Sequence, residues 1–163
     1  MNDVRLLFGR PKIREKEAFL AALRETQNRH SCVIQAMDAS VMVGERHAAF
    51  AVEKAMRAFS ERRNVAKDLG LEILRYASGQ RQIERALSMG VSEATQRVAL
   101  IVVENGTALE ISDIIEVDGD GPCWSPTAVK EAFDIQELEI EAVGEERIPD
   151  LVLERVALID AYR

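Results

Sequence analysis

The stretch from Gly70 to Gly90 constrains the fold most, because its apolar pattern changes period halfway along. Residues 71–76 are apolar on both faces of an extended chain, which favours a central strand covered on both sides, although a short helix would show the same pattern. From Ser78 on, apolar residues recur at the i, i+3, i+4 spacing of one helical face, and Gly90 suits a left-handed C-terminal cap. We therefore expect a strand, a tight turn at Ser78 and Gly79, and a short helix.

The expected turn is also a candidate anion site. A helix that begins there would present free backbone N–H groups and the positive end of its dipole to a ligand. Gly79 would let the ligand approach the backbone, and Gln80 and Arg81 could add side-chain donors. The segment from Ser78 to Arg81 therefore suits a phosphate or carboxylate. An ordinary strand-to-helix turn with Ser78 as N-cap explains the same residues.

The other segments extend the alternation of strands and helices. Residues 98–103 are apolar throughout, as is typical of a buried strand, and Ser125-Pro126 is an N-cap followed by a proline at the first helical position. With 163 residues, 47% of them hydrophobic, the chain is long enough for one domain with a substantial core. We predict a single α/β domain over residues 1–163: a mixed sheet of about four strands covered by helices, with a helical C-terminal part. Further strands are expected at 4–8 and 31–43, and helices at 15–24, 44–63, 107–115, 126–133 and 150–162.

The residues that catalyse reactions or bind metals form no recognisable motif. Cys32 and Cys123 are not in a CxxC pattern, and the two histidines lack neighbours at zinc-ligand spacing, so neither a metal nor another cofactor is predicted. The sequence contains no P-loop, no GxGxxG and no nucleophile elbow, which argues against an enzyme. No apolar run approaches the ~20 residues of a membrane span, and the first ten residues lack a signal-peptide pattern. We expect a cytoplasmic protein without a membrane partner.

Charge is distributed unevenly along the chain. Residues 1–100 hold 17 Lys and Arg against 12 Asp and Glu, whereas residues 101–163 hold 4 against 16. One surface could therefore face an anionic partner, although a solvated acidic C-terminal part explains the numbers equally well. The densest basic cluster is Arg62, Arg63 and Lys67.

The last predicted helix, 150–162, is more apolar than a surface helix should be. Val156 and Ile159 lie on one stripe of a helical wheel, and Leu153 falls farther round. Burial inside the domain would explain this pattern. A terminal helix usually keeps one solvent side, however, so we expect the apolar surplus to contact a partner protein.

One family matches these features. The run from Tyr76 to Ile83 (YASGQRQI), followed by Ala86-Leu87, closely resembles the regulatory subunit of the archaeal and eukaryotic KEOPS complex, a family that includes the human PRPK-binding protein. The resemblance also covers residues 35–38, 44–47 and 51–59, and it resumes at 152–159. About half of the chain follows the family pattern in the right order, whereas residues 104–148 match poorly.

The resemblance implies a non-enzymatic protein with two partners. Members of this family bind the small atypical kinase/ATPase of the complex through a helical surface that includes the C-terminal region. They also recruit tRNA, including its CCA end, for the synthesis of threonylcarbamoyl-adenosine by other subunits. A small-molecule or anion-binding α/β protein or enzyme that uses the Ser78–Arg81 turn is the alternative. Candidate tRNA contacts are Lys54, Arg57, Arg62, Arg63, Lys67, Tyr76 (for base stacking), Ser78, Gly79, Gln80 and Arg81, and candidate kinase contacts are Leu153, Val156 and Ile159.

Overall fold

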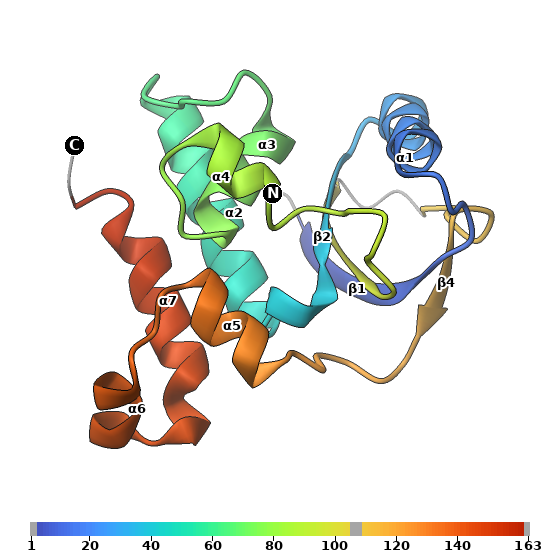
Figure 1. Cartoon of the computed structure of the whole chain (residues 1–163). Helices are drawn as coiled ribbons and strands as arrows, with labels where there is room; N and C mark the ends of the chain where they lie inside the picture. Colours follow the sequence, from blue (N-terminus) through green and yellow to red (C-terminus); the bar gives the residue numbers. More distant parts are fainter. Residues whose placement is uncertain (1–2, 105–108, 162–163) are drawn as a thin grey trace.

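A computed structural model describes residues 3–104 and 109–161 and shows one four-stranded sheet with helices on both faces (Figure 1). The strand order is β2-β3-β1-β4, and all three pairings are antiparallel. The predicted α/β fold with about four strands is therefore confirmed, but the sheet is antiparallel and not mixed as predicted. The strands are β1 (Asp3–Pro11), β2 (Val33–Asp38), β3 (Val98–Glu104) and β4 (Ile115–Asp118).

β3 divides the core into two layers because successive side chains of a strand point to opposite faces. Every residue of β3 is buried. Ile101 packs in the layer of α2 (Glu45–Ser60) and α3 (Leu69–Ala77), whereas Leu100 packs in the layer of α1 (Lys16–His30). The prediction of a buried strand at 98–103 is thus confirmed.

The C-terminal part is helical and packs beside α2 (Figure 1). As predicted, Ser125 caps a helix that has a proline in its first turn, and its Oγ accepts a hydrogen bond of 3.1 Å from the Ala128 N–H. The C-terminal helices are α5 (Pro126–Ala132), α6 (Glu137–Val143) and α7 (Ile148–Leu158). The remaining short elements are α4 (Ile83–Leu87) and the 3₁₀ turns η1 (Ala39–Val41) and η2 (Glu145–Arg147).

The strand predicted at residues 71–76 is wrong, because this segment forms the helix α3. Asp68 begins the helix by accepting a hydrogen bond of 2.8 Å from the Leu71 N–H. α3 lies between β2 and α2, and all of its residues from Glu72 to Ala77 are buried. The alternative of a short helix was the correct one.

Two further expectations concern the C-terminal half. Thr107 lies outside the described residues, and residues 109–114 contain turns before β4 begins at Ile115, so the helix predicted at 107–115 is wrong. α7 ends at Leu158, and Tyr162 is again outside the described part. Within the described ranges, none of the helices combines the length and apolarity that a bilayer-spanning segment requires.

Candidate functional site

The Ser78–Gly79 turn ends a helix instead of beginning one. Ser78 is the C-cap of α3, its side chain is fully buried, and its Oγ donates a hydrogen bond of 3.1 Å to the Arg75 carbonyl. The carbonyl end of a helix carries the negative end of the dipole, which disfavours an anion. The anion site predicted from the free N–H groups of a helix start is therefore wrong. α4, the next helix, has only five residues.

Gly79 is required at this turn for two reasons. Its φ of +66° lies in the left-handed region, where a side chain is strained. An added Cβ would also meet the Arg155 Cβ and the Phe133 ring at 3.3 Å. The turn is thus pressed against α7 and the end of α5, two elements far away in the sequence.

A surface hollow of about 500 Å³ opens beside this turn. Arg81 and Arg85 are exposed cations on its wall, and Arg81 Nη2 donates a hydrogen bond of 3.5 Å to the Leu158 carbonyl. Arg155 is held by two hydrogen bonds of 2.7 and 2.8 Å to Glu139. The full lining is Gly79–Gln82, Arg85, Ala132–Asp134, Arg155, Leu158 and Ile159. Gly79, Gln80 and Arg81 were predicted as site residues from the sequence, whereas the wall that α5 and α7 contribute has no sequence motif.

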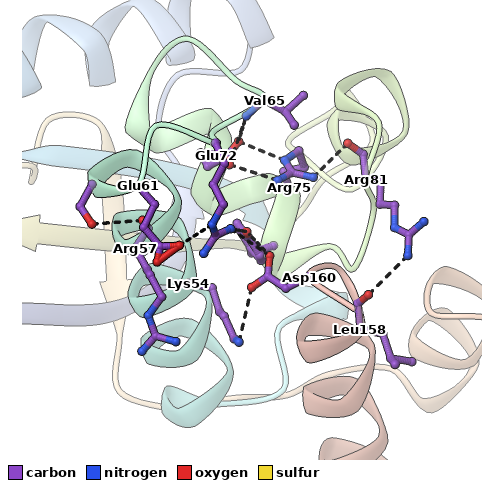
Figure 2. Close-up of polar contacts among 12 residues, drawn as sticks. Lys54, Arg57, Glu61, Val65, Glu72, Arg75, Arg81, Leu158 and Asp160 are labelled. Carbon is purple, nitrogen blue, oxygen red and sulfur yellow. Dashed lines mark hydrogen bonds and ion pairs between the residues drawn. The ribbon is translucent and has the colours of Figure 1, made fainter. Parts of the chain in front are cut away.

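Glu72 and Arg75 form a buried ion pair on α3, close to Arg81 (Figure 2). Glu72 is 0% exposed and Arg75 is 4% exposed, and their two hydrogen bonds measure 3.0 and 3.1 Å. Arg75 Nη1 also donates to the Arg81 carbonyl at 3.1 Å. Glu72 Oε1, which accepts from Arg75 Nε, also accepts the backbone N–H groups of Val65 (3.2 Å) and Ala66 (2.9 Å). The pair thus joins the segments on either side of α3.

Asp160, just past the end of α7, is the centre of a second polar cluster (Figure 2). It accepts a hydrogen bond of 2.6 Å from the Tyr76 hydroxyl and lies 3.3 Å from Arg63 Nη1 and 3.4 Å from Lys54 Nζ. Burial opposes the ionisation of Asp160, but the Tyr76 hydrogen bond and the two cations outweigh it, so its pKa is lowered. Burial and the Asp160 carboxylate raise the pKa of Tyr76.

Because of these contacts, tRNA can reach only some of the protein residues that were predicted to bind it. Tyr76 is 0% exposed, so its expected role in base stacking is not possible in this conformation. Lys54 and Arg63 are largely engaged with Asp160 inside the fold. Arg62 and Lys67 are exposed and form no ion pair with the residues that the structure describes. Arg57 is also exposed, although it lies 3.3 Å from Glu53.

His47 is a residue that the sequence analysis left without a role. Its Nδ1 accepts the Val43 N–H at 3.2 Å, which leaves Nε2 to donate to the Ala77 carbonyl at 2.7 Å. Burial lowers the pKa of His47 to about 4, despite the opposing effect of the Ala77 hydrogen bond. The neutral ring thereby ties the end of α3 to the start of α2. Nothing in the sequence marks this contact, since its partners are backbone groups.

The expected orientation of the last helix is corrected by the structure. Val156 is 0% exposed and Ile159 is 7% exposed, and both belong to the core beneath α2 and α5. They do not project towards a partner. Leu153 is half-buried and keeps a solvent side. Exposed apolar side chains of the C-terminal part are Leu138 (78%), Val143 (37%) and Leu158 (37%).

Residues 12–160 match the family model described as "Kinase binding protein CGI-121". This chain belongs to the CGI-121 family. The match covers most of the chain and includes the region 104–148, where the sequence patterns alone matched poorly. A curated relative from Methanocaldococcus jannaschii, named "Regulatory protein Cgi121", is 29% identical over 126 residues, which cover 77% of this chain and 82% of the relative. The resemblance to the KEOPS regulatory-subunit family is therefore confirmed.

Among the described residues of this CGI-121 protein, no group of three or more His, Cys, Asp or Glu side chains could hold a metal ion.

Proposed function

We propose that this CGI-121 protein is the kinase-binding subunit of a KEOPS complex and recruits tRNA by its CCA end for threonylcarbamoyl-adenosine synthesis. The family match over residues 12–160 carries this proposal. The chain contributes binding surfaces, and other subunits carry out the chemistry. Its place of action is the cytoplasm, where tRNA is modified.

The tRNA surface is proposed on the two exposed segments that flank α3. Arg62 and Lys67 lie on the segment before this helix, and Arg81 and Arg85 lie after it beside the hollow. Long-range attraction to RNA phosphates requires cations that are exposed and not already paired, and Arg62 and Lys67 meet both conditions. The hollow has room for a terminal nucleotide, with Gln80 on its wall as a hydrogen-bonding group. Arginine planes replace Tyr76 as the surface on which bases stack.

The test of the tRNA proposal compares two RNAs, one with and one without the CCA end. Arg81→Ala should weaken binding to intact tRNA more than binding to the truncated RNA, because the terminus would occupy the hollow. Arg147→Ala is the matched control, since Arg147 is exposed in the acidic C-terminal part and away from the hollow lining. Equal losses on both RNAs would show that Arg81 acts only as a general charge.

The kinase surface is proposed on the exposed side of the C-terminal helices. Leu153 remains a candidate for direct contact, while Val156 and Ile159 support α7 from beneath. A pull-down with the kinase/ATPase subunit from the same genome tests this assignment. Leu153→Arg should reduce capture while the protein stays folded, and Glu110→Arg, at an exposed position before β4, is the control. Full capture by the Leu153 variant would place the kinase elsewhere.

A second candidate function follows from the hollow alone. A cavity of about 500 Å³ with two exposed arginines also fits a small anionic metabolite. A thermal-shift panel of nucleotides and carboxylates separates the two functions. Stabilisation by a small anion in the absence of any tRNA binding would favour the metabolite.

A further inference from the structure

The Glu72–Arg75 pair connects two segments that both carry exposed cations. Arg62 and Lys67 flank the backbone N–H groups that Glu72 accepts, and Arg81 supplies the carbonyl that Arg75 binds. α3 separates these segments in the sequence. Figure 2 shows the carboxylate and the guanidinium between them.

Stability alone does not explain why these charges are buried. Removing two charges from water costs as much as their attraction returns, and an apolar pair of similar size is often as stable or more stable. The Arg75 guanidinium also lies 5.0 Å from the centre of the buried Tyr76 ring. An apolar pair, however, could not form hydrogen bonds with the backbone of the segments before and after α3. Both partners in this pair direct their remaining hydrogen bonds to that backbone.

We propose that Glu72 and Arg75 are positioning residues that hold the 62–67 segment and the 79–82 turn as one preformed surface for an RNA backbone. This inference rests on the tRNA binding proposed above. The two segments are already ordered before the RNA binds. Binding therefore does not include the conformational entropy cost of ordering them, which is the benefit of pre-organisation. The pair itself is too deeply buried to touch the RNA.

The decisive variant is Glu72→Met/Arg75→Met, which removes both charges together and leaves no unpaired buried ion. The affinity for tRNA should fall about 10-fold or more at every salt concentration, since ordering even one backbone residue on binding costs roughly that factor. The slope of log K against log salt should stay unchanged, because no phosphate contact is lost. Amide exchange at Val65 and Ala66 should become faster. The matched control is Arg97→Met/Asp118→Met, which removes an ion pair of 2.7 Å between the residue before β3 and the last residue of β4 and should alter none of these quantities.

Each outcome decides the proposal. A folded double variant with wild-type affinity overturns it, even if Val65 and Ala66 exchange faster, and leaves the tRNA function standing. A reduced salt slope would mean that the pair contacts phosphate directly, which also overturns it. If wild-type protein binds no tRNA, the proposed function fails and the inference fails with it. If the double variant does not fold, Arg75→Lys replaces it, because one ammonium cannot bind both Glu72 and the Arg81 carbonyl. The expected result is a smaller loss of tRNA affinity with an unchanged salt slope. Wild-type affinity would overturn the inference.

Discussion

Ile159→Ala tests whether the end of α7 belongs to the core. Ile159 is 7% exposed, so the substitution removes three buried carbon groups at about 0.8 kcal/mol each and leaves a cavity. We expect a loss of about 3 kcal/mol in the free energy of unfolding, within the usual range of about 2–5 kcal/mol for such changes. For a chain of this length this corresponds to a melting temperature lower by about 6–12 °C.

The neighbouring residue provides the control. Leu158 is 37% exposed, so Leu158→Ala should cost about 1.5 kcal/mol and shift melting by about 3–6 °C, half of the loss expected for Ile159→Ala. Both variants should still capture the kinase below their melting temperatures if Ile159 only supports the helix. Equal, small melting shifts for the two variants would refute the core assignment. Loss of kinase capture by a fully folded Ile159 variant would show that Ile159 contacts the kinase directly.

Three further predictions concern charge. Arg62→Glu should weaken tRNA binding and reduce the log–log salt slope by about 0.7–0.9 for each lost phosphate contact, and an unchanged slope would remove it from the site. Asp160→Asn should lower the melting temperature by about 4–8 °C, since it weakens charge-assisted hydrogen bonds worth about 2 kcal/mol; a smaller shift would show that the cluster is solvent-screened. Arg155 lowers the pKa of Glu139 from 4.5 to about 2, with help from the Gln136 N–H. The ionised Glu139 therefore contributes its full share to the free energy of unfolding above pH 4.5, and this contribution is lost as the pH falls towards 2. The free energies of unfolding of wild type and Glu139→Gln should therefore become equal near pH 2. At neutral pH they should differ by about 1 kcal/mol once solvent screening is allowed for.

The elements with clear punctuation or a continuous apolar run were predictable from the sequence. β3 is buried on both faces and reads as an uninterrupted apolar run, and α5 begins at a Ser-Pro signal. α3 was misassigned because its apolar run is short, and periodicity alone does not distinguish a buried strand from a short helix over so few residues. β4 was missed because an edge strand of four residues leaves little pattern to detect.

The candidate site was less predictable than the fold. The basic residues were visible in the sequence, but their accessibility depends on Asp160, which lies 84 residues after Tyr76 and engages three of the groups nearby. The α5 and α7 wall of the hollow is similarly invisible, because Phe133 and Arg155 meet the turn only through the fold. Contacts between distant segments and backbone groups carry no local motif.

The central place of β3 has a consequence for synthesis on the ribosome. β1 and β2 both pair with β3, and neither pairs with the other, so no strand pairing between these elements can form before residue 98 has been made. At about 5–20 residues per second, the 66 residues between the ends of β2 and β3 take roughly 3–13 s to add. During that interval the emerging chain holds two apolar strands with unsatisfied edges. This is a window for chaperone binding, and helices such as α2 are the structure that can form first, because their contacts are local.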